Sequence, residues 1–252
     1  MKRLVCLVLL LSVLLLAACG QVTPMPINPE TTDPADSETA AALLERYAEE
    51  ILHATSPPYG RTIFSLGKNK TILGAAVGDL NGDGKPDIAV TVEIAPERDR
   101  ETYVLLYENG KYRVRHANSG LVRRYNEGGI WGDPFDGLSI EGDVLTVSLY
   151  GGSAWRWWYQ YHFKYSGGKL ALSGTEAVYF HATLGDGTKT VCDYTNGTVE
   201  SRTWAESGES QYNGTLLYAG TFHPTPSTFD APIIDDCTYK QYHTIDITGE
   251  IS

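Results

Sequence analysis

The stretch that decides the fold is Gly78-Asp79-Leu80-Asn81-Gly82-Asp83-Gly84-Lys85-Pro86-Asp87-Ile88-Ala89-Val90. Residues with side-chain oxygens stand at its loop positions one, three, five and nine, which are Asp79, Asn81, Asp83 and Asp87. Alternate residues of a tight loop point their oxygens inward, and the two glycines between them permit the turn. The β-branched run at 88–92 then predicts a strand, so the stretch is a loop that leads into a β-sheet.

The oxygen donors of this loop favour calcium. Ca²⁺ takes about 6–8 oxygen ligands, whereas Mg²⁺ resists dehydration and needs strict octahedral geometry. Three carboxylates this close together repel one another unless a cation lies among them. We therefore predict a Ca²⁺ site formed by Asp79, Asn81, Asp83, the backbone carbonyl of Lys85, and Asp87. A solvated acidic turn without metal is the alternative, because Asp, Asn and Gly are common in turns.

The loop is not an EF-hand, because its twelfth position is Val90 rather than Glu and a strand follows it. The D-x-N-x-D-G-x-x-D pattern before a strand resembles the FG-GAP or VCBS repeat, the calcium-bearing hairpin of integrin-type β-propellers. That resemblance implies that the loop joins two neighbouring strands and that calcium fixes it through the five residues named above. Only one such repeat is present, since Gly185-Asp186-Gly187 is too poor in acids, so a complete propeller is not expected.

A wider likeness spans residues 74–200. The glycine-rich run at 128–137 and the run at 150–157 make the chain similar to a group of bacterial lipoproteins that contain VCBS repeats. The resemblance implies no known activity, so it bears on the fold more than on the function.

The chain begins with the pattern of a secretory signal. Lys2 and Arg3 precede an apolar run at 4–16, which is too short to span a membrane comfortably. Leu16-Ala17-Ala18-Cys19 resembles the lipobox of bacterial lipoproteins, in which the Cys receives a diacylglycerol after cleavage before it. We expect a signal peptide at 1–18 and lipidation at Cys19; an ordinary secretory peptide with an incidental Cys is the alternative.

The remaining chain divides into a tether and one domain. Residues 19–36 contain the lipidated Cys and a proline-rich, flexible segment, and residues 37–252 form a single β-rich domain. A helix is expected from Asp33-Pro34 to a point before Ser56, with one apolar stripe that packs on the sheet.

Cys6 is lost with the signal peptide and Cys19 carries lipid, which leaves Cys192 and Cys237 as an even pair. In an oxidising compartment, we expect these two to form a disulfide. Two buried thiols are the alternative.

Period-two patterning begins after Tyr59. Turn signals at 108–111, 141–143, 166–168 and 195–198 separate alternating apolar runs. The fold class is therefore mainly β, with antiparallel meander sheets of roughly a dozen strands, one N-terminal helix and an FG-GAP-like hairpin. We expect a loop at 221–232 and a last strand at 239–247.

An aromatic strand occupies residues 155–165. Its odd-numbered residues are aromatic and predict a core face. The other face is polar except for one tryptophan, and an exposed Trp158 there would stack on a sugar ring, with Tyr150 nearby across the hairpin. The candidate ligand face consists of Arg156, Trp158, Gln160 and His162. A Trp158 packed under a loop or the helix is the alternative.

The net charge of −11 argues against nucleic-acid binding and against a polybasic membrane-surface module. We find no nucleophile elbow and no His pair with zinc spacing, so we do not expect an enzyme. Glycoside hydrolysis would need a pair of catalytic carboxylates. Asp133 and Asp136 are the best candidates for such a pair, yet a proline-containing turn explains them well.

These observations lead to two hypotheses. The first is a lipid-anchored, extracytoplasmic, calcium-binding β domain of the bacterial cell envelope. It serves as a binding or surface-scaffold module, with the membrane and an envelope protein or glycan as partners. The second is a glycan-binding or glycan-active envelope protein that uses the Trp158 face.

Overall fold

The computed structural model describes residues 38–53, 64–66, 68–205, 214–225 and 227–233. These residues contain twelve strands and two short helices, which confirms the mainly β fold class. The predicted signal peptide, Cys19, the tether, the start of the helix at Asp33 and the last strand at 239–247 lie outside the described residues. No helix within the described ranges is long and apolar enough to cross a membrane.

The N-terminal helix is interrupted. Helix α3 (Ala40–Arg46) begins after Thr39, whose side chain accepts a hydrogen bond from the Ala42 amide at 3.3 Å. Helix α4 (Ala48–Leu52) follows directly, and Tyr47 between them leaves helical geometry at φ −99° and ψ 16°. The Ile51 amide still donates to the Tyr47 carbonyl at 3.0 Å, so the two segments share one apolar stripe. The single predicted helix is therefore present as two segments.

The first sheet contains five antiparallel strands in chain order. They are β1 (Phe64–Ser65), β2 (Lys70–Gly78), β3 (Asp87–Ile94), β4 (Asp99–Glu108) and β5 (Lys111–Asn118). The β4–β5 turn was predicted from its Asn-Gly pair, and both residues have positive φ (51° at Asn109, 83° at Gly110). The first sheet is thus a simple meander, as expected.

The second sheet contains seven antiparallel strands and is also a meander. They are β6 (Phe135–Glu141), β7 (Val144–Gly152), β8 (Trp155–Ser166), β9 (Lys169–His181), β10 (Gly187–Asp193), β11 (Thr198–Trp204) and β12 (Thr215–Thr221). The predicted turns at 141–143, 166–168 and 195–198 join neighbouring strands of this sheet. The described strands form two open sheets, not the blades of a complete propeller.

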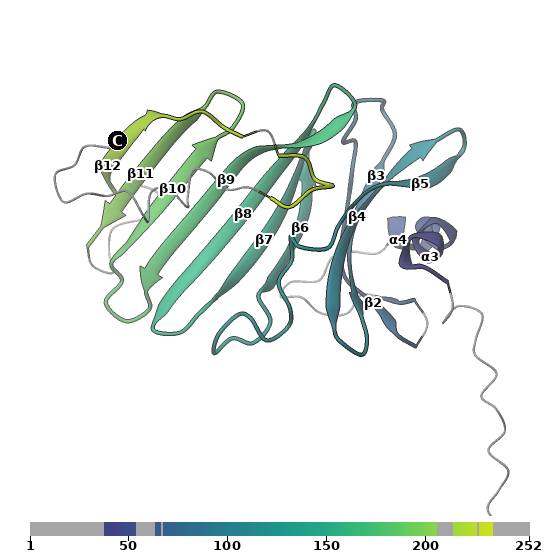
Figure 1. Ribbon diagram of the computed structural model, residues 1–252, viewed down its shortest axis with the longest axis horizontal. Helices are drawn as coiled ribbons and strands as arrows, with labels where there is room; N and C mark the ends of the chain where they lie inside the picture. Colours follow the sequence, from purple (N-terminus) through teal and green to yellow (C-terminus); the bar gives the residue numbers. More distant parts are fainter. Residues whose placement is uncertain (1–37, 54–63, 67, 206–213, 226, 234–252) are drawn as a thin grey trace, which may run out of the picture. The chain divides into compact units, whose positions relative to one another are not determined.

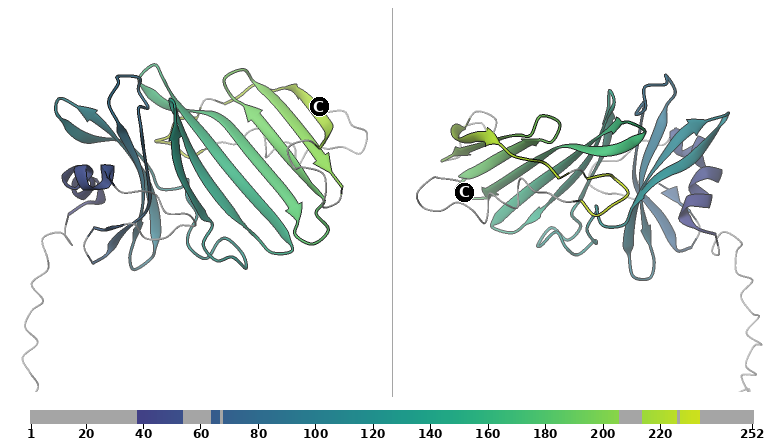
Figure 2. Two further views of the ribbon diagram at one scale, coloured as in Figure 1. Left: turned by 180° about the vertical axis from the view of Figure 1, so that it is seen from behind. Right: turned by 45° about the horizontal axis from the view of Figure 1, so that its top comes forward.

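The first sheet is covered on both faces. Leu43, Leu44 and Ile51 of the helices pack with the β3 residues Ile88 and Val90 on one face. Residues of the opposite face belong to a second apolar cluster that joins both sheets. Figures 1 and 2 show the helices and the seven-stranded sheet on opposite sides of β2–β5. Burial on both faces explains why residues 87–92 of β3 are all buried rather than alternately buried and exposed.

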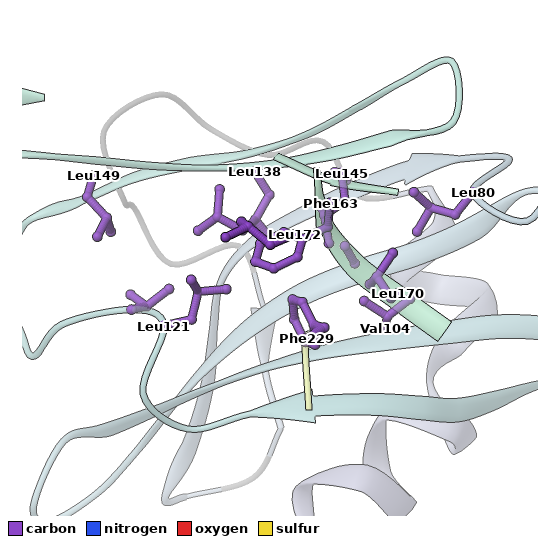
Figure 3. Packing of buried hydrophobic residues seen from close by; sticks show 14 of the residues in the cluster. Leu80, Val104, Leu121, Leu138, Leu145, Leu149, Phe163, Leu170, Leu172 and Phe229 are labelled. Atoms are coloured by element: carbon purple, nitrogen blue, oxygen red, sulfur yellow. The ribbon is translucent and has the colours of Figure 1, made fainter. Parts of the chain in front are cut away.

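The cluster between the sheets centres on Phe163 of β8 and Phe229 of the segment after β12, both fully buried. Their rings meet edge to face, with centroids 5.1 Å apart (Figure 3). The odd-numbered face of β8 therefore contributes to the core, as predicted. Trp155 is the exception, because it is 41% exposed and stacks on Tyr179.

The buried side chain of Arg100 links β4 to the segment between β5 and β6, which connects the two sheets. The Arg100 side chain is 0% exposed and pairs with Glu93 and Asp133 at 2.9 and 2.6 Å. Its guanidinium also donates to the Arg123 carbonyl at 3.0 Å. Asp133, a candidate catalytic acid from the sequence, is thus engaged in an ion pair that holds the segment between β5 and β6.

We expect Phe163→Ala to lower the free energy of unfolding by about 3–5 kcal/mol, because it leaves a cavity between the two sheets. The measurement is urea denaturation followed by tryptophan fluorescence. Leu184→Ala is the control, since Leu184 is 62% exposed and its truncation should change stability by no more than about 0.5 kcal/mol. A loss at Phe163 no larger than the control's would contradict the two-sheet core.

Candidate functional site

The predicted metal loop connects β2 to β3, and Gly78 pairs directly with Asp87 across the base of this hairpin. Gly82 and Gly84 adopt positive φ values of 76° and 80°, which lets the backbone reverse within the loop. The sequence-based prediction that the loop joins two neighbouring strands is therefore confirmed.

The polar side chains of the loop turn back onto its own backbone. One Asp79 carboxylate oxygen accepts hydrogen bonds from the Gly82 and Asp83 amides at 2.8 and 3.1 Å. The other accepts from the Gly84 amide at 2.8 Å. Asn81 Oδ1 accepts from the Asp83 amide at 3.0 Å. Asp83 Oδ1 accepts from the Lys85 amide at 2.8 Å. These bonds hold the loop in one compact conformation.

Asp87 differs from the other acids because it is fully buried. One of its oxygens accepts from the Leu80 amide at 3.0 Å, and the other accepts from the Tyr107 amide of β4 at 3.2 Å. Burial raises the pKa of the Asp87 carboxyl above its usual value, although the amides that donate to it act in the opposite direction. Asp87 thus fastens the loop to the sheet.

The donor set of the loop fits calcium in chemical type. All five predicted ligands offer oxygen, and a carboxylate oxygen that accepts one N–H retains a lone pair for a cation. Within the described residues, no three His, Cys, Asp or Glu side chains gather into a metal-binding group. The calcium ligands Asp79, Asn81, Asp83, Lys85 and Asp87 therefore stay a prediction.

Residues 73–104 match the family model of the FG-GAP repeat. The FG-GAP match covers most of β2, the loop, all of β3 and the first part of β4, so it contains the whole predicted calcium loop. Comparison with the curated proteins and with the solved structures finds no match. The expected likeness to bacterial VCBS-repeat lipoproteins has no support in these comparisons.

The candidate ligand face lies on the side of the second sheet opposite to the Phe163 core. Trp158 pairs with Tyr150 of β7, as predicted, and its indole donates to Asp136 at 3.2 Å. Asp136 sits at a register shift between Phe135 and Gly137, an irregularity of the kind that re-aims a side chain. Trp158 is half-buried rather than freely exposed.

The other three residues of this face bond to neighbours on β7. Gln160 donates to the Ser148 hydroxyl at 3.0 Å, and His162 Nδ1 lies 2.9 Å from the Thr146 hydroxyl. Burial lowers the pKa of His162 below its usual value, which favours the neutral ring. Arg156 donates to the Tyr150 hydroxyl at 3.2 Å. The structure thus brings all four sequence-predicted residues onto one face.

Trp131 joins this face from the segment before β6, and sequence analysis did not assign it there. The Ile130 amide donates to the Gly152 carbonyl at 3.1 Å, which sets Trp131 beside β7. Gly129 permits this approach, because a Cβ there would lie 2.5 Å from the Gly152 oxygen. Trp131 is 50% exposed, and the Arg156 guanidinium carbon lies 4.8 Å from its ring centroid. The glycine-rich run around Trp131 was the sequence feature that could have indicated this close approach to β7.

The cysteine predictions fall partly outside the described residues. Cys192 is buried in the cluster between the sheets. Its predicted partner Cys237 and the predicted lipidation site Cys19 lie outside the described ranges, so both modifications stay predictions.

We expect Asp87→Asn to lower the free energy of unfolding by about 1–3 kcal/mol, because the new amide group presents N–H to a buried backbone donor. The measurement is urea denaturation in calcium-free buffer containing EGTA, which separates this contact from metal binding. Asp143→Asn is the matched control, since the Asp143 side chain is 61% exposed. Equal stability of Asp87→Asn and the control would contradict the anchoring role of Asp87.

Proposed function

We propose that this protein is an extracytoplasmic binding module whose FG-GAP repeat is stabilised by calcium. The observation that carries the proposal is the loop at 79–87, with three carboxylates, one amide oxygen and one backbone carbonyl in a single hairpin turn matched by the FG-GAP repeat. Without a cation, the Asp79, Asp83 and Asp87 charges are opposed only by Lys85 within the loop. A bound Ca²⁺ would neutralise this excess and hold the turn.

We further propose that the module is attached to the bacterial cell envelope by a lipid at Cys19. The support is the sequence alone: a basic start, a short apolar run and Leu16-Ala17-Ala18-Cys19. The proline-rich segment at 19–36 would separate the β domain from the membrane surface. Binding is proposed rather than catalysis, because the sequence contains no nucleophile elbow and no zinc-spaced His pair.

Calcium at a free concentration 100-fold above its dissociation constant should add about 2.7 kcal/mol to the stability of the folded protein. The melting temperature, measured by calorimetry in EGTA and then in excess calcium, should therefore rise. Asp79→Asn combined with Asp83→Asn should abolish the rise, because it removes two of the three loop charges.

Asp193→Asn is the matched control for this experiment. Asp193 also caps a turn, accepting from the Thr195 and Asn196 amides at 2.8 and 3.0 Å, but without further carboxylates in its turn. It should retain the full calcium response. A wild-type melting temperature that calcium leaves unchanged would refute the proposed function.

The second candidate function is glycan binding on the outer face of the second sheet. It is favoured by the grouping of Trp131, Tyr150 and Trp158 with hydrogen-bonding groups of Arg156 and Asp136. Aromatic surfaces with polar neighbours bind the apolar face and the hydroxyl groups of a sugar ring. An apolar patch without these polar groups could not form hydrogen bonds to the hydroxyl groups of a glycan.

If this face binds glycans, Trp158→Ala should weaken binding on a glycan array by about 30-fold, which is the loss typical of a central aromatic anchor. Trp155→Ala is the matched control, because Trp155 lies at the end of the same strand with opposite parity. Equal losses in both variants, or an array without any bound glycan, would leave only the first function.

A further inference from the structure

A cavity of about 680 Å³ lies between the loop at 79–87, here called the FG-GAP loop, and the turn at 166–168 that joins β8 to β9. Its polar lining comes from Asn81 and Asp83 of the loop, from Glu108, Arg115 and His116 of β4 and β5, and from Tyr165 and Ser166 of β8. This volume is within the range of small-molecule sites. The cavity is separate from the Trp158 face, because Tyr165 and Trp158 have opposite parity on β8.

A relay of hydrogen bonds fixes the back of this cavity. His116 is 8% exposed, and its Nδ1 lies 2.7 Å from an Asp230 oxygen, so Nδ1 carries the proton and donates it. The opposite nitrogen, Nε2, shares a hydrogen bond with the Tyr165 hydroxyl. Burial raises the pKa of Tyr165 above its usual value, so the hydroxyl stays protonated at neutral pH. The Tyr165 oxygen retains at least one lone pair that can accept a hydrogen bond from a ligand.

Glu108 and Arg115, which both line the cavity, form an ion pair that offers hydrogen-bond acceptors and donors. Arg115 Nε lies 2.9 and 3.0 Å from the two carboxylate oxygens of Glu108, and the Arg115 side chain remains 50% exposed. Together, Glu108 and Arg115 are neutral, while Asp83 adds one negative charge. This net negative charge disfavours an anionic ligand, and the mixture of polar groups with apolar surface such as Leu106 suits a ligand that carries both.

We propose that this cavity binds a neutral polyhydroxylated ligand, a mono- or disaccharide, through Tyr165, Glu108, Arg115 and the loop residues Asn81 and Asp83. Hydroxyl groups both donate and accept, so they match a wall of mixed acceptors and donors. Asn81 and Asp83 belong to both the predicted calcium loop and the cavity wall. Coupling between sugar and calcium therefore rests on the proposed function. A loop ordered by calcium presents these two side chains in fixed positions, so sugar binding is tighter when calcium is bound.

The experiment measures binding of glucose, mannose, maltose and cellobiose to the full mature chain by saturation-transfer NMR, in excess calcium and in EGTA. Calcium binding is measured separately by calorimetry. At least one sugar should bind the calcium-treated protein, and EGTA should weaken that binding by about tenfold, a factor that corresponds to about 1.4 kcal/mol. Tyr165→Phe should weaken it at least as much, because it keeps the ring and removes the hydroxyl.

The matched control is Tyr179→Phe on the neighbouring strand β9, which should bind sugar as the wild type does. Glu108→Gln provides a second test, because Glu108 is at the surface and its replacement does not disturb the core. Calcium binding with no bound sugar overturns the cavity proposal and leaves the proposed function standing. A third outcome is a protein that binds sugar but no calcium. If Tyr165→Phe and Glu108→Gln both abolish its sugar binding, the result supports the cavity and overturns its coupling to calcium. Sugar binding lost in Trp158→Ala but kept in Tyr165→Phe overturns the cavity in favour of the outer face.

Discussion

The carboxylate of Asp87 is the contact on which the FG-GAP loop depends. It lies at the first residue of β3 and accepts from the loop at Leu80 and from β4 at Tyr107. Because the Leu80 side chain is itself 1% exposed, the loop is anchored in the core at one end and tied to a second strand through Asp87. The acids at its tip are thus presented by a rigid base, a favourable arrangement for any site that must hold a cation.

The layered packing decides which surfaces are left for binding. The helices cover one face of the five-stranded sheet and the Phe163–Phe229 core covers the other, so neither face of β3 is open. What remains at the first sheet is its rim, where the loop and the cavity lie. The second sheet keeps an outer face, and this face holds Trp158, Tyr150 and Trp131. Two different candidate surfaces therefore result from one packing arrangement.

The two candidate surfaces differ in their chemistry. The outer face combines aromatic rings with Arg156 and Asp136, so it offers stacking together with hydrogen bonds. The cavity near the loop is lined by charged and hydroxyl-bearing side chains, and its Tyr165 is held by hydrogen bonding to His116, which in turn contacts Asp230. Only the cavity shares residues with the FG-GAP repeat, so a cation in the loop would act on the cavity directly, whereas an effect on the outer face would have to pass through the whole second sheet.

Local pattern alone predicted most of the strands, the hairpin turns and the acidic loop at 79–87, because turn chemistry and period-two alternation act between residues close in the chain. The pairing of Trp158 with Tyr150 also followed from the hairpin register. Tertiary structure alone decided that Asp87 reaches Tyr107, that Asp133 pairs with Arg100, and that Trp131 joins Trp158. It also brought His116, Tyr165 and Asp230 together from three separate segments. No local pattern records these contacts, because they depend on how two sheets and their connecting segments pack, and that packing is set by burial summed over the whole domain.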